Sequence, residues 1–284
     1  MVSHPKLEIN SKNFMIITLA IVGVVLTILF IGKINLSIKF RNQVKELFAQ
    51  STSISNQRFY KNQLVGLPDP VQRYFNHILK EGQPYQSCAR IKHLGQFKTG
   101  IDKDWINIKG EQYAITEKPG FIWKGTTSMF VARDMYIADK GRLVVSLLSL
   151  FNVVNAKGEQ YDQGELLRWL GESVMYPTNF LPSENLNWLP IDENSAQLTF
   201  NYQGFSLFFK VTFNQVGEIT ELETKRYMHL ENLERWVIKT TLYKRFSDVL
   251  IPTAFDVIWR LEYGDFSYAH FIITEVEYNK AEKF

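Results

Sequence analysis

Cysteine is nearly absent from this sequence, because Cys88 is the only one in 284 residues. A single cysteine excludes an internal disulfide and a cysteine-based metal cluster. The histidines are scattered, without a pair at the helical or hairpin spacing that a metal site uses. They are His4, His77, His93, His229 and His270. We therefore expect no metal site.

The usual signatures of nucleotide binding and catalysis are missing as well. The sequence has no GxGxxG, no phosphate-binding loop ending in Gly-Lys-Ser/Thr, no HExxH and no Gly-x-Ser-x-Gly. Each of these motifs places backbone amides, metal ligands or a nucleophile for a specific chemistry. We therefore expect no cofactor and no catalytic residue.

An excess of positive charge is missing from most of the chain. Of 32 basic and 29 acidic residues, six basic and two acidic ones lie in residues 1–50, which leaves 26 and 27 for the rest. Nucleic-acid binding proteins present a basic surface to the phosphate backbone. A nucleic-acid partner is therefore not expected.

One long apolar run is present near the N-terminus. The eighteen residues 14–31 carry no charge, and as a helix they would span ~27 Å, close to the thickness of a hydrocarbon core. A cleaved signal peptide would have a shorter apolar region that ends in small residues. We predict an N-terminal tail over 1–13 and a single uncleaved transmembrane helix over 14–32, in a bacterial cytoplasmic membrane. The basic residues that flank this segment slightly favour a cytosolic body, and both sides of the membrane stay possible.

Residues 33–57 are predicted to form an amphipathic stalk and a linker. Apolar residues recur among basic ones, which fits either a stalk continuing the membrane helix or a helix packed on the body. They are Ile34, Ile38, Phe40, Val44, Leu47 and Phe48, and the Ser/Thr-rich stretch 51–57 is the linker.

The body, residues 58–284, has two predicted amphipathic helices. The first begins with Asp69 as N-cap, Pro70 at the first helical position and Gln72 three residues after the cap. The second follows Asp162, with Glu165 completing a similar capping pattern, and ends before Pro177.

The rest of the body alternates apolar and polar residues with short turns, which predicts antiparallel strands. We expect about five strands before the second helix and about six after it, with residues 142–154 forming one strand. A sheet of this size curls. The predicted fold is mainly β (α+β), a large curved antiparallel sheet or unclosed barrel with an apolar concave side.

Aromatic residues are spread over nearly every predicted element, and a minority of them could line a site for an apolar ligand. The alternation of side chains along one predicted strand places Trp259 on the inward face of the sheet. Glu172 lies off its helix's apolar stripe, either solvated or reaching a pocket. Asp192 is expected in a turn and Arg226 at the surface. The predicted ligand-binding residues are Trp123, Tyr136, Glu172, Tyr176 and Trp259.

The stretch 67–75, LPDPVQRYF, resembles the opening motif of a bacterial family of membrane-anchored proteins known only as a domain of unknown function. The resemblance covers about residues 67–278 and implies no established activity. At fold level, the order helix–strands–helix–strands is similar to periplasmic lipoprotein carriers with an unclosed barrel. Further matching residues are Phe121, Trp123, Asp134, Tyr136, Glu172, Tyr176, Trp188, Asp192, Pro252, Trp259, Gly264, Phe266 and Tyr268.

Three functions follow from these observations. The leading one is a non-catalytic, membrane-tethered module that binds a lipid or another apolar small molecule, with membrane lipid as its partner. The second is a membrane-surface enzyme that uses Glu172 and Asp192 as a carboxylate pair. The third is an envelope scaffold whose protein partner is unknown.

Overall fold

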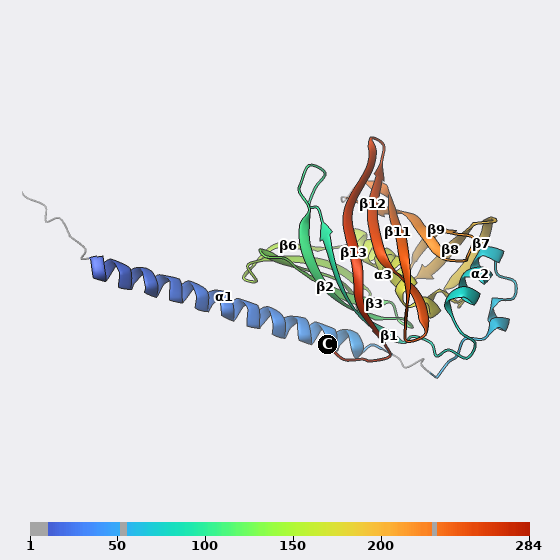
Figure 1. Ribbon diagram of the computed structural model, residues 1–284, viewed down its shortest axis with the longest axis horizontal. Helices are drawn as coiled ribbons and strands as arrows, with labels where there is room; N and C mark the ends of the chain where they lie inside the picture. Colours follow the sequence, from blue (N-terminus) through green and yellow to red (C-terminus); the bar gives the residue numbers. More distant parts are fainter. Residues whose placement is uncertain (1–10, 52–55, 229–231) are drawn as a thin grey trace, which may run out of the picture.

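The computed structural model describes residues 11–51, 56–228 and 232–284 of the chain (Figure 1). The predicted N-terminal tail lies mostly outside these residues, as does the centre of the predicted linker. One long helix extends away from a β-rich body in which smaller helices pack against a single curved sheet (Figure 1). The expected mainly β fold is confirmed.

Every neighbouring pair of strands in the sheet is antiparallel, and the described residues contribute thirteen strands. The chain starts in the middle with β1, winds outward to β6, crosses to β7 and winds back until β13 pairs with β1. Strands β6 and β7 are therefore the two edges, and the sheet stays unclosed. The strands are Cys88–Phe97 (β1), Ile106–Ile115 (β2), Gly120–Thr126 (β3), Phe130–Ile137 (β4), Lys140–Leu147 (β5), Phe151–Lys157 (β6), Leu186–Asp192 (β7), Ser195–Tyr202 (β8), Phe205–Phe213 (β9), Ile219–Tyr227 (β10), Leu233–Phe246 (β11), Val249–Leu261 (β12) and Gly264–Tyr278 (β13).

Two strands were not expected from the sequence. Residues 142–154 form β5 and β6 rather than one strand, because Leu148 and Ser149 turn the chain with positive φ angles of 50° and 64°. The other is β7, whose last residue, Asp192, accepts a hydrogen bond from the backbone N–H of Asn194 at 2.9 Å. Strand β7 contains Pro190, and an edge position tolerates the missing N–H.

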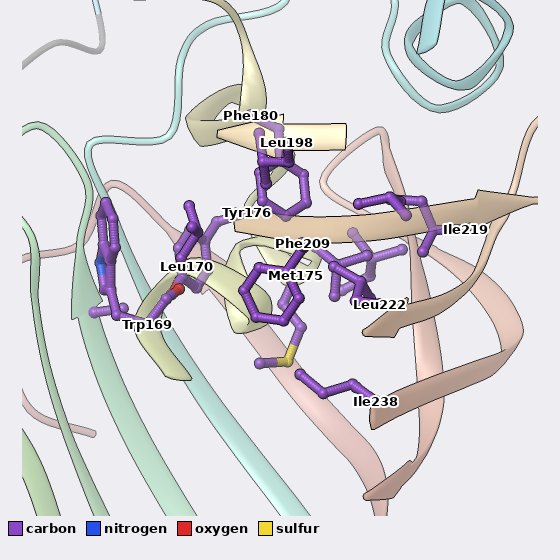
Figure 2. Close-up of a cluster of buried hydrophobic side chains, with 14 of the residues drawn as sticks. Trp169, Leu170, Met175, Tyr176, Phe180, Leu198, Phe209, Ile219, Leu222 and Ile238 are labelled. Atoms are coloured by element: carbon purple, nitrogen blue, oxygen red, sulfur yellow. The ribbon is translucent and has the colours of Figure 1, made fainter. Parts of the chain in front are cut away.

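The crossover between the two edges fills part of the concave side. It consists of helix α3 (Glu159–Glu172) and two short 3₁₀ turns, η2 (Ser173–Met175) and η3 (Pro177–Phe180). Figure 2 shows their apolar side chains meeting those of β8 to β11 in the main core. Trp169 also donates a hydrogen bond from its indole N–H to the carbonyl oxygen of Ile115 at 2.8 Å, which ties α3 to β2.

The predicted start of the second helix was wrong, because α3 begins at Glu159, four residues before the expected first residue, Gln163. The carboxylate of Asp162 does not cap the helix. Instead, it accepts a hydrogen bond from the backbone N–H of Gly141 at 2.7 Å and pairs with Lys140 at 2.9 Å. Gly158, with a φ of 128°, stands at the N-cap. The first predicted helix is confirmed as α2 (Asp69–Ile78), which packs near β8 and β12. Its predicted cap was wrong, because Asp69 is the first helical residue, Pro68 is the N-cap, and no side chain caps the helix.

Helix α1 (Ser11–Phe48) continues without a break from the apolar segment into the predicted stalk. Its exposed half meets the length and hydropathy of a membrane span, whereas its C-terminal half packs on the convex side of the sheet. The buried side is Gly32, Phe40, Val44 and Leu47, at helical spacing. Two residues of the predicted stripe, Ile34 and Ile38, are instead exposed.

This contact forms a second hydrophobic cluster, separate from the main core. Its members are Phe40, Val44, Leu47, Cys88, Tyr113, Ile115, Ile122, Met135, Ile137 and Val144. The centre of the Phe40 ring lies 6.0 Å from that of Tyr113, and Lys124 Nζ lies 4.4 Å from the centre of the Phe40 ring. The side-chain amide of Gln43 also accepts a hydrogen bond from Arg133 at 2.7 Å. Sheet and helix are therefore held together by packing as well as polar contacts.

We expect Phe40→Ala to lower the free energy of unfolding by about 3 kcal/mol, because it removes a buried ring and leaves a cavity. The control is Ile38→Ala on the exposed side of the same helix, with an expected change below ~0.5 kcal/mol. Urea unfolding of the detergent-solubilised full chain, followed by tryptophan fluorescence, measures both. Equal effects of the two substitutions would contradict the packing of α1 on the sheet.

Candidate ligand-binding cavity

The concave side of the sheet contains a partly open cavity of about 570 Å³ beside α3. Most of its lining is apolar and comes from strands on both sides of the β1–β13 pair. The apolar lining includes Ile91, Phe97, Ile108, Trp123, Phe130, Ala132, Val145, Val154, Trp236, Phe255, Val257, Trp259, Ala269, Phe271 and Ile273. A concave site of this size with few polar groups is typical of small-molecule binding.

One wall of the cavity is a stack of rings centred on His93. Trp123 donates a hydrogen bond from its indole N–H to His93 Nε2 at 2.7 Å, and the Phe271 ring lies 4.4 Å from the imidazole. Burial lowers the pKa of His93 to about 4. The imidazole is therefore neutral at physiological pH, and its Nε2 accepts the hydrogen bond from the indole N–H. Gly110 lies directly against this imidazole, so a β-carbon there would clash with the ring.

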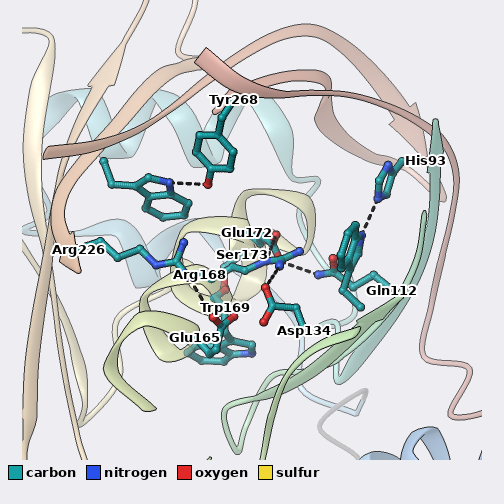
Figure 3. Close-up of polar contacts among 12 residues, drawn as sticks. His93, Gln112, Asp134, Glu165, Arg168, Trp169, Glu172, Ser173, Arg226 and Tyr268 are labelled. Atoms are coloured by element: carbon teal, nitrogen blue, oxygen red, sulfur yellow. Dashed lines mark hydrogen bonds and ion pairs between the residues drawn. The ribbon is translucent and has the colours of Figure 1, made fainter. Parts of the chain in front are cut away.

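Helix α3 carries a charged cluster into the cavity, as Figure 3 shows. Arg168 pairs with Asp134 of β4 at 2.5 Å and with Glu172 one turn later at 2.8 Å. Glu172 also accepts a hydrogen bond from the amide of Gln112 at 2.7 Å. The guanidinium carbon lies 5.0 Å from the centre of the Trp123 ring. Burial lowers the pKa of Arg168, but the Glu172 and Asp134 carboxylates outweigh this effect and raise it.

A second arginine approaches the same helix from β10. Arg226 Nη2 lies 3.0 Å from Glu165 Oε1, and its guanidinium carbon lies 4.8 Å from the centre of the Trp236 ring. Trp236 in turn donates a hydrogen bond to the hydroxyl of Tyr268 at 3.0 Å. Both arginines are thus held by carboxylates and by aromatic faces, an arrangement that suits the flat, weakly hydrated guanidinium group.

Glu165 is buried against the other acidic groups of the cluster. Its burial, and next the charge of Asp134, raise its pKa well above the usual 4.5, although Arg226 and Arg168 oppose the change. In the described residues, Glu165 Oε2 and Asp134 Oδ1 are buried without a hydrogen-bond partner. A protonated Glu165 satisfies this arrangement, because it adds a donor and removes one of the negative charges.

The structure brings three of the five predicted ligand-binding residues together. Trp123, Glu172 and Trp259 line the cavity. Tyr136 and Tyr176 are fully buried in the main core and are not among its lining residues. Tyr176 instead donates a hydrogen bond from its hydroxyl to the carbonyl oxygen of Trp169 at 3.1 Å. The role of these residues in ligand binding stays a prediction.

The carboxylate pair expected of an enzyme is not formed. Glu172 is held by Arg168 and Gln112 inside the cavity, whereas Asp192 is exposed at the end of edge strand β7. Asp192 borders a different surface depression, together with Glu193 and Lys210. In the part of the chain that the structure describes, no group of three His, Cys, Asp or Glu side chains is placed to hold a metal ion.

Sequence patterns missed most of the polar side of the cavity. Arg226 was expected at the surface, but its side chain is only 13% exposed because α3 covers it. Asp134 and Glu165 come from a strand and a helix that no local pattern brings together. One signal was available, namely the i, i+4 spacing of Arg168 and Glu172 on one helix.

We expect the substitution Glu165→Gln to stabilise the protein at neutral pH. A raised pKa means that the wild type is fully stabilised below pH 4.5 and loses stability as pH rises toward the folded-state pKa. The glutamine variant carries no such penalty and still accepts the hydrogen bond from Arg226. The stability advantage of the variant over the wild type, measured by urea unfolding, should thus grow as pH rises from about 4.5 toward the raised folded-state pKa of Glu165.

The matched control is Glu172→Gln, which removes a carboxylate that Arg168 needs and should destabilise the protein at neutral pH. If Glu165→Gln also destabilises it there, Glu165 is ionised in the folded state and the assignment is wrong.

The solved structures that resemble the chain include a LolA superfamily protein from Nitrosomonas europaea and a putative outer membrane lipoprotein-sorting protein domain from Vibrio parahaemolyticus. The first has 10% identity and a TM-score of 0.42, and the match covers 74% of this chain and 92% of that one. The second has 8% identity and a TM-score of 0.42, with coverage of 76% and 93%.

No curated protein sequence matches the chain significantly. One family model does match, over residues 57–271, and its description is "Family of unknown function (DUF6544)". The resemblance to an uncharacterised family is thereby confirmed. Since the match covers well over half of the sequence, the chain belongs to this family of unknown function.

Proposed function

We propose that this protein is a membrane-tethered module that binds a lipid, or another ligand with a long apolar part, without catalysis. The observation that carries the proposal is the partly open, aromatic-lined cavity on the concave side of the sheet. A sheet that served only as a scaffold would fill this side with its own side chains, because protein interiors are close-packed.

The size of the cavity favours one acyl chain over two. At ~30 Å³ for each non-hydrogen atom, which is the share of a water molecule in the liquid, 570 Å³ accommodates about nineteen such atoms. One long acyl chain with a small polar end has this size, whereas the two chains of a phospholipid exceed it. The ligand is therefore a single-chain lipid, or one chain of a larger lipid whose remainder stays outside.

The lining offers a place for each part of such a molecule. The chain lies among the rings contributed by Trp123, Trp259 and Phe255, where its burial is favourable by roughly 25 cal/mol for each Å². The polar end faces the side formed by α3, where Arg226, Gln112 and Tyr268 carry hydrogen-bond donors. Ester and carboxylate oxygens are acceptors, so a lipid end group complements this side.

Helix α1 supplies the tether. Its only hydroxyl groups between residues 14 and 31 belong to Thr18 and Thr27, which donate to the carbonyl oxygens of Phe14 and Gly23 at 2.9 and 2.8 Å. Each polar group of the segment is thus satisfied within the helix, as the interior of a bilayer requires. The unbroken connection to the packed C-terminal half of α1 supports an anchor that is retained.

The substitution Ala132→Phe tests ligand binding by filling the cavity. A diazirine-bearing eighteen-carbon fatty acid is added to vesicles that contain the full chain, and cross-linked peptides are identified by mass spectrometry after irradiation. In the wild type we expect cross-links on strands β3 and β12 as well as on α1. In the variant the cavity cross-links should fall about tenfold relative to those on α1, which corresponds to ~1.4 kcal/mol.

The peptides of α1 provide an internal reference, because the helix contacts lipid in both proteins. A second reference is Ala254→Phe, which enlarges a half-buried alanine of β12 outside the cavity and should leave the ratio unchanged. If the wild type is cross-linked on α1 alone, the cavity does not take up acyl chains.

A further inference from the structure

Helix α1 runs along the convex side of the sheet from one end of the strands to the other. Near its C-terminus, Leu47 lies against Gly120, where β3 begins. Fifteen residues earlier, Gly32 lies against the turn between β5 and β6, so closely that a β-carbon there would be 3.1 Å from the carbonyl oxygen of Ser149. The apolar half of α1 therefore leaves the body at the end of the sheet where the β5–β6 turn lies (Figure 1).

The position of Gly32 sets the depth of this turn. Gly32 directly follows the apolar segment 14–31, which spans ~27 Å as a helix and so matches the hydrocarbon core. If that segment crosses the bilayer, Gly32 lies at the boundary between acyl chains and headgroups. The β5–β6 turn, which contacts Gly32, is then held at the same level.

Large apolar side chains are exposed around this turn. Phe151 is 66% exposed, Val153 59%, Met129 61% and Leu148 46%. We call these four residues the turn-end patch. The backbone N–H of Leu148 donates to the carbonyl oxygen of Met129 at 2.8 Å, which joins the β5–β6 and β3–β4 turns.

The hairpin that carries most of the turn-end patch has no negative charge. Residues 141–158 contain Arg142 and Lys157 but no aspartate or glutamate. These two basic residues are paired in register at the other end of the hairpin, so the turn itself carries no charge. An exposed, uncharged apolar cluster fits a membrane surface, where apolar side chains enter the headgroup layer.

The cavity reaches the same end of the sheet. Its lining includes Lys98 and Thr99, beyond the end of β1, and Met228, beyond the end of β10. It also includes Phe130 and Val154, the sequence neighbours of Met129 and Val153. The turn-end patch therefore borders the part of the cavity that lies toward the apolar half of α1.

We propose that the turn-end patch is a second membrane contact, which seats the open end of the cavity on the bilayer so that an acyl chain passes directly between leaflet and cavity. The proposal rests on the proposed function insofar as α1 is the membrane anchor. It adds to the anchor a direct contact of the body with lipid, in the orientation that the docking of α1 on the sheet sets.

Site-directed spin labelling of the full chain tests this orientation. Cysteine is introduced singly at Phe151, Val153, Val216 and Leu19, and the labelled proteins are reconstituted at low density into vesicles of phosphatidylethanolamine and phosphatidylglycerol. Cys88 is retained because it is buried, and the labelled wild type gives the background. Power saturation then compares the exposure of each label to oxygen, which enters lipid, and to a water-soluble nickel chelate.

We expect labels at 151 and 153 to be accessible to oxygen and shielded from the chelate. The matched control is Val216, which is 60% exposed in the turn that packs against α2, at the opposite end of the strands, and its label should show the reverse. The label at Leu19 reports on the anchor alone. Labels at 151 and 153 in water with Leu19 in lipid would overturn the membrane contact but not the anchor; all of them in water would overturn both.

Shielding that disappears when the protein is diluted further into lipid would show that a second copy covers the turn-end patch, and this also overturns the proposal.

The paired variant Phe151→Asp, Val153→Asp tests the route of the ligand. It should reduce the fatty-acid cross-links on β3 and β12 while those on α1 persist. If the variant unfolds like the wild type and its cavity cross-links are unchanged, the acyl chain does not pass directly between the leaflet and the cavity.

Discussion

Packing of the crossover helix against the inside of the sheet is the constraint on which the rest of this structure depends. A sheet of thirteen antiparallel strands has two large faces, and twist makes it curl. Helix α3 joins the two edge strands across the hollow, so the sheet curves around it. Because α3 fills only part of that hollow, the remaining space is a cavity, and the groups that hold α3 in place also line it.

That double role explains the unusual chemistry of the cavity. Arg168 fixes α3 to β4 through Asp134, and Arg226 fixes it to β10 through Glu165. Buried charges are costly unless they are paired and hydrogen-bonded. Here Arg168 is paired with Asp134 and Glu172, Arg226 is hydrogen-bonded to Glu165, and an indole ring lies beside each guanidinium group. A largely apolar cavity can thus contain charged side chains.

The sequence was informative where a physical pattern repeats locally. The long apolar run, the Pro70 helix start and the period-two strands all correspond to observed elements. Prediction failed where tertiary contacts override local rules: Asp162 binds Gly141 instead of capping α3, and two residues with positive φ split the expected strand over 142–154. For the site, the alternation of residues along β12 correctly predicted that Trp259 faces the concave side. The proximity of Asp134, Glu165 and Arg226, by contrast, depends on how strands distant in the sequence align with α3. No local signal encodes such register.

The second cluster has a consequence for the lone thiol of the chain. Cys88 is 1% exposed and lies in the cluster that Phe40, Val44 and Leu47 of α1 complete. Burial also raises its pKa, so little of the reactive thiolate exists while the helix is docked. Alkylation of Cys88 then requires α1 to undock from the sheet. The rate of alkylation therefore reports how often the anchor helix separates from the body.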